Sequence, residues 1–402
     1  MLKKIKYYLK FVVLTSFLFY ACTESFDIES ISFESALVIE ASITTDEKFQ
    51  EVHLSKAFKI DEDGPHPESN AIVSIKDENG ITYEFSEITP GIYQSNAKFS
   101  ASVNTVYQLF ITTASGEVYE SKPEKTSSTS QIDDVYATKD IGADGSEEFR
   151  INIDSYDPTG KSKYYRYTYE ETYKIVAPYW SSLKFNILSR IPPLVEVIAK
   201  KDLSKKTCYQ TKKSTLIFQT ETTGLTEDRV TKYVLRRIPV DAFITSHRYS
   251  ILVKQHVQSY EAYTYYSILN KFSNSSNLLS QNQPGFFNGN IYSTSNKDKK
   301  VIGFFEISSV SSKRMFFNYR DFFKYHRPPY PQTCENYAPE ISPGFEEPPV
   351  PLIRAIESGN WLYFDINRVR DEIFPGPYLL KRKGCGDCTV YGSNIKPSFW
   401  ID

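Results

Sequence analysis

Methionine, tryptophan and histidine are scarce in this chain, with 2, 3 and 5 residues among 402. Tyrosine and phenylalanine are plentiful instead, at 30 and 27 residues, and this balance favours β-strands over a helical bundle. Charge of either sign is also not in excess, because 47 Lys and Arg face 49 Asp and Glu. A nucleic-acid-binding protein would show a basic surplus. The composition therefore predicts a β-rich protein without a nucleic-acid partner.

Sequence motifs of catalysis and cofactor binding are absent as well. The chain contains no H-E-x-x-H zinc motif, no G-x-S-x-G nucleophile turn, no Walker A motif and no G-x-G-x-x-G motif. His256 is the best single candidate for an acid or base, although a packed or surface histidine is the commoner case. A dispersed pair of carboxylates that cleaves glycans stays open, since such a pair leaves no local motif. We predict no catalytic residue, no metal site and no cofactor.

No apolar run is long enough to cross a bilayer, which takes about 20 residues. The longest, Phe11–Tyr20, follows a lysine-rich start and ends at Ala21-Cys22. This order is typical of a secretory signal, and the cysteine at its end predicts a lipoprotein signal over residues 1–21 with the lipid on Cys22. An ordinary signal peptide with an incidental cysteine is the alternative. Residues 22–35 would then form a tether.

Cysteine is limited to four residues beyond Cys22, namely Cys208, Cys334, Cys385 and Cys388. Four thiols in an exported chain fit two disulfides. Zinc is the rival interpretation, but only Cys385 and Cys388 have C-x-x-C spacing. We expect these two to pair separately with Cys208 and Cys334, which would fix the C-terminal tail to the body. A local bridge between Cys385 and Cys388 is the other possible outcome.

Residues 36–122 alternate apolar and polar side chains in short runs separated by turn signals, of which Asn79-Gly80 is the strongest. About seven strands in this length predict an immunoglobulin-like β-sandwich. The polar segment 123–131 follows as a linker. The fold class is therefore all-β, with this sandwich preceding a larger β-rich domain over residues 132–402 that has one packed helix and long loops.

Within the second region, Tyr165, Tyr167 and Tyr169 fall on one face of a predicted strand. Such a row of rings can contact sugars, peptides or a partner protein, but cross-strand packing is the commoner role. Separate strands are expected at Val301–Ile307 and Arg314–Asn318. Residues 327–351 are rich in proline and predict an irregular segment.

One helix is predicted, over Ser259–Phe272, with Ser259 as its N-cap and an apolar stripe that packs on the sheet. A long polar loop follows and carries Phe286 and Phe287. Two adjacent phenylalanines in a loop would suit a membrane surface or a protein partner, and filling a gap in the core is the alternative.

Several stretches, taken in order, resemble one family. They are Leu37-Val38-Ile39-Glu40-Ala41, Gly289-Asn290-Ile291, Val301-Ile302-Gly303-Phe304-Phe305 and Cys385-Gly386-Asp387-Cys388. Together they resemble the Bacteroidota envelope lipoproteins that share domain of unknown function 4249. The acidic start of the tether also resembles the signal that sends such lipoproteins to the outer face of the outer membrane.

The resemblance implies an accessory lipoprotein of the outer membrane, with no catalytic residues to carry over. Genes of similar lipoproteins often neighbour TonB-dependent receptors. We therefore expect a lipid-anchored protein at the cell surface that binds or caps such a receptor during nutrient uptake. The alternatives are an exported glycan or peptide hydrolase and a structural or assembly component of the outer membrane.

Overall fold

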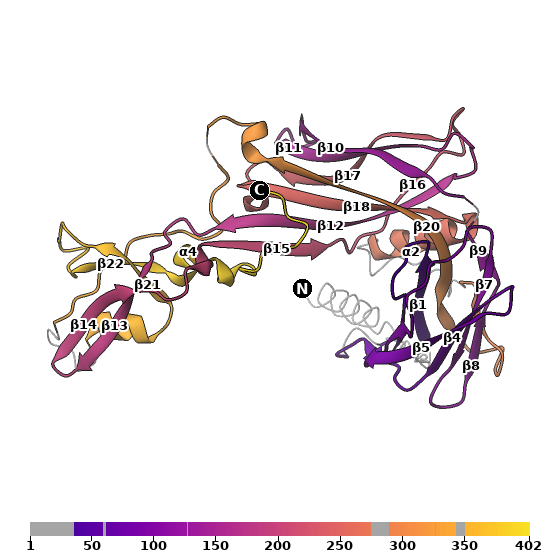
Figure 1. Cartoon of the computed structure of the whole chain (residues 1–402), viewed down its shortest axis with the longest axis horizontal. Coiled ribbons are helices and arrows are strands. Elements are labelled where there is room, and N and C mark those ends of the chain that lie inside the picture. The colour runs from indigo at the N-terminus through magenta and orange to yellow at the C-terminus, as the bar shows by residue number, and fades with distance from the viewer. Residues whose placement is uncertain (1–35, 59–61, 127, 275–288, 326, 343–349) are drawn as a thin grey trace, which may run out of the picture.

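The computed structural model describes residues 36–58, 62–126, 128–274, 289–325, 327–342 and 350–402. Cys22, Phe286 and Phe287 lie outside the described residues. The chain is all-β, as predicted, and its described residues form three parts: an N-terminal curled sheet, a central sandwich and an arm (Figure 1). None of the helices in these described ranges has the length and apolar character needed to cross a membrane.

The curled sheet contains the strands predicted for an immunoglobulin-like sandwich. Its strands are β1 (Leu37–Thr44), β2 (Glu51–Lys56), β3 (His66–Pro67), β4 (Ile72–Asp77), β5 (Thr82–Thr89), β6 (Ile92–Ser95), β7 (Val106–Thr112), β8 (Val118–Ser121) and β9 (Glu124–Lys125). They form one hydrogen-bonded sheet in the order β1-β2-β6-β5-β4-β7-β8, which curls around a single core. The expected sandwich would have two separate sheets, whereas here one continuous sheet encloses the core. The turn at Asn79-Gly80 joins β4 to β5 as predicted, with Gly80 at a φ of 86°.

Two strands from far along the chain complete this sheet. β19 (Ile291–Ser293) pairs with β8, and β20 (Val301–Asn318) pairs with β1 in parallel. Segment 36–122 therefore shares its sheet with residues beyond the predicted linker. β20 is one continuous strand where the sequence predicted two, because the buried Ser309 and Ser311 hydroxyls bond to the Ser128 carbonyl and the Ile132 amide.

The side chain of Asn290 closes the curled sheet between β19 and β20. Its Nδ2 donates to the Phe305 carbonyl at 2.9 Å, and its Oδ1 accepts from the Phe305 amide at 2.7 Å. The neighbouring Gly289 has no space for a side chain, since a Cβ there would lie 1.6 Å from the Gly303 carbonyl oxygen. Asn290 also donates to Glu124 at 3.0 Å.

The central sandwich has two sheets with a shared core (Figure 1). One contains β10 (Gln131–Ile141), β11 (Glu147–Tyr156) and β17 (Arg229–Pro239). The other contains β12 (Tyr164–Val176), β15 (Thr207–Lys213), β16 (Phe218–Glu221), β18 (Arg248–Gln258) and the second half of β20. Alternating residues of β11 such as Phe149, Ile151 and Ile153 are fully buried between them.

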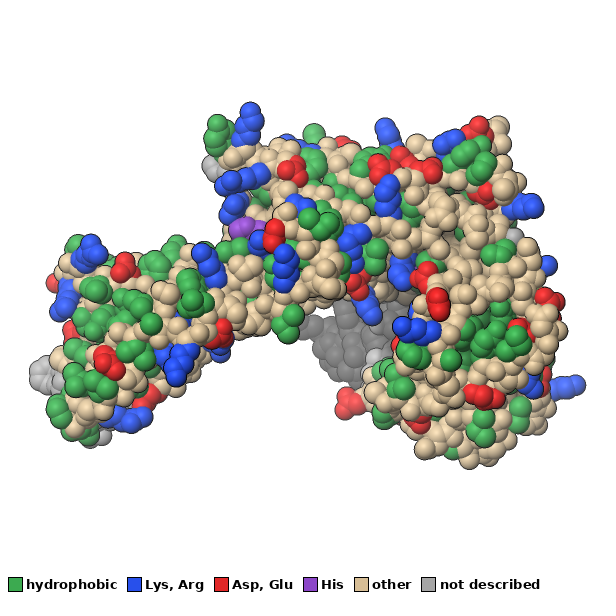
Figure 2. Space-filling model, in the orientation of Figure 1, with side chains coloured by type: hydrophobic (Ala, Val, Ile, Leu, Met, Phe, Trp, Pro, Cys, Tyr) green, Lys and Arg blue, Asp and Glu red, His purple; other side chains and the backbone are tan. Residues whose placement is uncertain are grey.

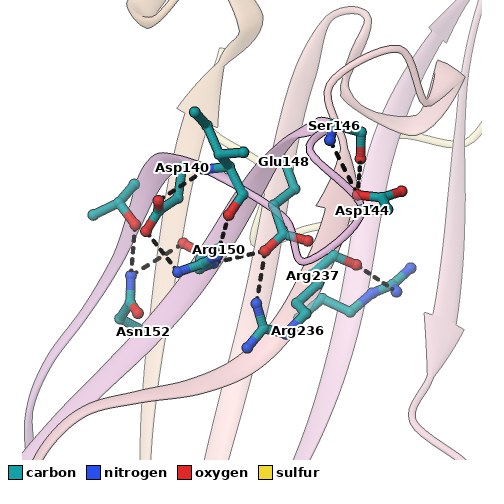
Figure 3. Close-up of polar contacts among 10 residues, drawn as sticks. Asp140, Asp144, Ser146, Glu148, Arg150, Asn152, Arg236 and Arg237 are labelled. Atoms are coloured by element: carbon teal, nitrogen blue, oxygen red, sulfur yellow. Dashed lines mark hydrogen bonds and ion pairs between the residues drawn. The ribbon is translucent and has the colours of Figure 1, made fainter.

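The outer face of the three-stranded sheet is covered by ion pairs (Figure 3). Glu148 accepts hydrogen bonds from Arg150 and Arg237, both at 2.6 Å, and Arg150 also reaches Asp140 at 2.6 Å. Glu148 and Arg150 alternate along β11 with the buried Phe149 and Ile151, while Asp140 and Arg237 come from the neighbouring strands β10 and β17. The network explains why this sheet can face water on one side.

The arm extends from the sandwich (Figure 1). It contains the hairpins β13 (Leu183–Arg190)–β14 (Pro193–Ala199) and β21 (Trp361–Ile366)–β22 (Tyr378–Arg382), with α3 (Pro351–Glu357) and α4 (Lys383–Gly386). A separate small core holds it together, with Leu352, Ile353 and Leu380 completely buried. Sequence reasoning missed α3, which begins with a proline at its first turn, where the missing N–H costs nothing.

Two disulfides connect these parts, and Cys385 and Cys388 pair separately as predicted. Cys208 on β15 bonds to Cys388, and Cys334 bonds to Cys385 at the start of the tail. The tail then returns to the sandwich, where the backbones of Tyr209 and Ser393 exchange two hydrogen bonds of 2.8 and 2.9 Å.

The predicted helix is present as α2 (Tyr260–Asn274). Ser259 Oγ accepts from the Ala262 amide at 3.1 Å, which confirms its role as N-cap. The predicted stripe of Ala262, Tyr265, Tyr266 and Leu269 packs against Phe304 of β20. The helix therefore lies across the junction between the curled sheet and the sandwich.

Replacing Cys208 and Cys388 together by alanine should destabilise the protein by roughly 2–5 kcal/mol, because the bond closes a loop of 180 residues in the unfolded chain. Urea denaturation measures this. Limited proteolysis should then cut after residue 388 in the variant and not in the wild-type protein. Equal stability and equal cleavage of the two proteins would contradict the stapling role.

Glu124 predicts a pH dependence of stability. Burial, together with the nearby carboxylates of Glu261 and Glu306, raises the pKa of Glu124 to about 7. The hydrogen bond from Asn290 and the charge of Lys122 act in the opposite direction. A raised carboxyl pKa stabilises the fold at low pH, and this contribution is lost as the pH rises from about 4.5 to about 7. Glu124→Gln should therefore melt at a higher temperature than wild type near pH 8 and at the same temperature near pH 4.

The control for this variant is Glu84→Gln, at an exposed position of β5. Its melting temperature should follow that of the wild-type protein at every pH. A Glu124→Gln protein with the same pH profile as wild type would show that Glu124 does not titrate in this range.

Candidate functional site

The tyrosine row on β12 is part of the sandwich core. Tyr165 and Tyr167 are completely buried, and Tyr169 is partly buried beside the same core. The Tyr165 hydroxyl donates to Asp228 at 2.8 Å, and the Tyr167 ring stacks on Tyr233. Neither buried ring is available to a ligand, so cross-strand packing describes this row.

His256 is also enclosed. One ring nitrogen lies 3.2 Å from the Thr168 hydroxyl and the other lies 3.2 Å from the Ser308 hydroxyl. Burial holds the pKa of His256 well below its ordinary value, and the charges of Arg166, Lys254 and Lys48 lower it further. The imidazole is therefore a neutral, hydrogen-bonded core residue.

The candidate site is a groove of about 510 Å³ where the curled sheet meets the sandwich, which we call the junction groove. Its walls come from the outward faces of β1 and β20 and from the packed stripe of α2. The lining residues are Val38, Ile39, Glu40, Ala41, Ser42, Glu51, His53, Arg166, Thr215, Ile217, Tyr265, Tyr266, Leu269, Ile302, Gly303 and Phe304. An apolar and aromatic wall with a few polar groups is typical of a binding site.

Close packing of backbones shapes this groove. Gly303 brings β20 against β1, since a Cβ there would lie 2.2 Å from the Ile39 carbonyl oxygen. The resemblance motifs that contain Ile39, Gly289, Asn290 and Gly303 therefore meet at one place in the fold.

An ion pair closes the inner end of the groove. Arg166 donates to Glu306 at 2.7 Å, the Glu306 side chain is completely buried, and Gln258 donates to its other oxygen at 2.8 Å. The Arg166 guanidinium also lies over the Tyr266 ring, 4.8 Å from its centroid. Burial lowers the pKa of Arg166, but Glu306 and Tyr266 raise it, and the net effect is an increase.

One nitrogen of this arginine is unsatisfied. Arg166 Nε is buried and has no hydrogen-bond partner among the described residues. Burial and the charge of Glu40 raise the pKa of Tyr265 to about 12, so its hydroxyl stays protonated. The groove thus has an unpaired donor near its inner end, Arg166 Nε, and tyrosine rings along one wall.

The outer rim carries polar groups on neighbouring strands. Ser42 faces Glu51 and Glu40 faces His53 in the register of β1 and β2, and His53 lies 3.5 Å from Glu51. Both side chains of that pair are about half exposed, at 45% and 48%. Among the described residues, no group of three His, Cys, Asp or Glu side chains is arranged to hold a metal ion.

Sequence reasoning missed the junction groove and its ion pair. Arg166 and Glu306 are far apart in the chain, and only the fold brings them together. A signal was present, because Glu306 is the single charge in the otherwise apolar and serine-rich segment 301–311. A lone acid at an inward position of a strand calls for a buried partner.

Arg166→Met should destabilise the protein by about 3–5 kcal/mol, because it leaves the Glu306 carboxylate buried without its partner. Adding Glu306→Met should restore most of that stability, since an apolar pair replaces the ion pair. Arg190→Met is the matched control: its pair with Glu357 is exposed, at 65% for Arg190, and is worth about 0–1 kcal/mol. Urea denaturation measures all three variants, and a double variant no more stable than Arg166→Met would contradict the assignment.

Comparison with known proteins gives one family. The model of a family described as a domain of unknown function (DUF4249) matches residues 23–314. No curated protein matches the chain. The matched segment contains the curled sheet, α2 and β20 as far as Arg314, which are the elements that build the junction groove. Because the match covers more than half of its length, the chain belongs to the DUF4249 family.

Proposed function

We propose that this protein is a lipid-anchored accessory protein of the outer membrane that faces the cell surface and binds a TonB-dependent receptor during nutrient uptake. In this proposal the protein binds other molecules and does not catalyse a reaction. The lipid on Cys22 holds it at the membrane. The arm and the junction groove provide the surfaces that contact the receptor or its cargo.

The disulfides support the exported location. Cys208–Cys388 and Cys334–Cys385 join segments that are distant in the chain. Disulfides form and persist in oxidising compartments such as the bacterial periplasm and the cell surface. This agrees with the signal expected over residues 1–21.

Exposed apolar side chains on the arm are the observation that supports partner binding. The turn of the β13–β14 hairpin exposes Leu188, Ile191 and Leu194 to 54%, 74% and 54%, and the loop after β21 exposes Val369 and Ile373 to 77% each. Figure 2 shows hydrophobic side chains across the arm, interspersed with charged ones. Apolar side chains gathered on a projecting element are typical of a protein contact surface.

Anchoring on the same membrane would increase how often such a contact forms, without any new interaction between the two proteins. A tether over residues 22–35 reaches at most about 50 Å when fully extended. Two proteins held on one membrane at that range meet at a high effective concentration, so a weak contact through the arm is sufficient.

Hydrolysis is the second candidate, and the rim of the junction groove favours it. Ser42, His53 and Glu51 lie on one face of neighbouring strands, which is the residue set of a nucleophilic site. The His53–Glu51 pair is exposed, and water weakens an ion pair or hydrogen bond there. Binding is therefore the better-supported function.

The first experiment compares the wild-type protein with Cys22→Ser in the native host. The wild-type protein should sediment with outer membranes and carry acyl groups at its N-terminus by mass spectrometry, whereas Cys22→Ser should be soluble. Ser25→Ala is the matched control and should remain in the membrane. A wild-type N-terminus without acyl groups would contradict the anchor.

The second part of the same experiment uses the anchored protein as bait. A TonB-dependent barrel should co-purify in mild detergent and should be lost with Ile191→Asp and Leu194→Asp together. Replacing the exposed Leu225 by Asp, outside the arm, should leave it unchanged. Recovery of the anchored protein alone at native expression would contradict the partnership and leave the anchor intact.

A further inference from the structure

A second cleft, of about 420 Å³, lies at the opposite end of the sandwich from the junction groove. We call it the basic cleft and define it by Lys174, Ser246, His247, Arg248, Arg320 and Arg327. β18 begins at this cleft and ends just before α2, and eleven extended residues span about 35 Å. Figure 2 shows Lys and Arg side chains gathered at this end, beside the C mark of Figure 1. The two cavities are therefore separate sites.

Positive charge exceeds negative charge in the basic cleft. Four cationic side chains line it, and the acids beside them are Asp321 and Asp402. Asp321 is occupied by the backbone amide of Asn318 at 2.7 Å. Asp402 contacts Lys174 at 3.2 Å and Lys396 at 2.6 Å. Arg320 and Arg327 are exposed and form no ion pair within the described part of the chain.

The cleft also contains polar atoms that have no partner. Ser246 is 5% exposed, and its hydroxyl is buried without a hydrogen bond to any described residue. Arg248 Nε is likewise buried and unpartnered, although another nitrogen of Arg248 donates to Asn318 at 3.2 Å. The Arg248 guanidinium is held in place by the Phe316 ring, 4.9 Å away. Buried donors are normally satisfied, so these two call for an acceptor.

His247 reports the positive potential in the cleft. Burial, together with the charges of Arg327, Lys174 and Arg320, lowers the pKa of His247 to about 4. The other charged groups that line the cleft are Arg248, Asp321 and Asp402. The ring is neutral at neutral pH and adds a hydrogen-bonding group without adding charge.

We propose that the basic cleft binds a tetrahedral oxyanion, a phosphate or sulfate group, through Ser246, Arg248 and the cations around them. Guanidinium, ammonium and hydroxyl donors converging on one cavity match the several acceptor oxygens of such a group. A carboxylate offers two oxygens and uses fewer of these donors. The inference does not depend on the lipid anchor or on the receptor.

Isothermal titration calorimetry with inorganic phosphate and sulfate tests the site on the Cys22→Ser chain, which carries no acyl group. We expect saturable binding of both anions at low ionic strength and about tenfold or greater loss with Arg248→Met, which removes a charge-assisted hydrogen bond. Arg190→Met on the arm removes the same charge and should bind as the parent does. Equal affinity in Arg248→Met, or no saturable heat with either anion, would overturn the proposal.

Ser246→Ala gives a sharper result, because its hydroxyl has no partner to lose. It should weaken phosphate binding while leaving the anion-free protein as stable as the parent or more so. Phosphate should also raise the pKa of His247 in an NMR titration, since a bound anion offsets the surrounding cations. Unchanged phosphate affinity in Ser246→Ala would remove that residue from the site.

Vesicles identify the source of the anion. Binding to phosphatidylglycerol vesicles that is lost in Arg248→Met, with none to phosphatidylcholine, assigns a lipid headgroup. Binding of inorganic phosphate without vesicle binding assigns a soluble phosphate or sulfate. Either assignment requires the saturable phosphate or sulfate binding measured by calorimetry, and its absence contradicts the oxyanion site.

Discussion

The fold depends on one strand that belongs to two structures. The first half of β20 pairs in parallel with β1, and its second half pairs antiparallel with β18. Every residue of a strand has backbone groups that need hydrogen-bond partners. Because the two halves of β20 find these partners on different strands, β20 joins the curled sheet and the sandwich into one sheet. Because the connection is made of backbone hydrogen bonds, the junction groove has a rigid floor.

Buried polar side chains where the two parts join have hydrogen-bond or ion-pair partners. Glu306 on β20 is neutralised by Arg166 from β12, and Asn290 satisfies the backbone of Phe305 where β19 turns away. A well-packed apolar pair could replace the ion pair of Arg166 and Glu306, whereas an apolar residue in place of Asn290 would leave the Phe305 backbone groups without partners. These contacts fix the relative position of segments that are far apart in the chain, and that is what shapes the groove.

The sequence predicted mainly those features that depend on a few neighbouring residues or on residue type. The hairpin at Asn79-Gly80, the N-cap at Ser259 and the pairing of Cys385 and Cys388 with distant cysteines were all readable from the sequence. The continuity of β20 was not, because its middle is serine-rich and lacks apolar alternation. The buried hydroxyls of Ser309 and Ser311 are satisfied by the segment that carries Ser128 and Ile132, and only the fold supplies those partners.

The two cavities could not be predicted from the sequence either, since their residues come from β1, β2, β12, β18, β20, α2 and several connecting segments. The tyrosine row on β12 shows the opposite problem. Its alternation was correctly recognised, yet the pattern is the same whether the rings face solvent or a second sheet. The sheet of β10, β11 and β17 covers this side of β12, and the Tyr165 and Tyr167 rings are therefore buried.

The shared strand has a consequence for biogenesis. Leu37 begins the parallel pairing opposite Val301, so during synthesis one edge of β1 has no partner until residues 301–308 have followed. Contacts so distant in sequence form slowly, and an open strand edge invites association with other chains. This architecture therefore needs more protection from chaperones during folding than a tandem of independent domains would need.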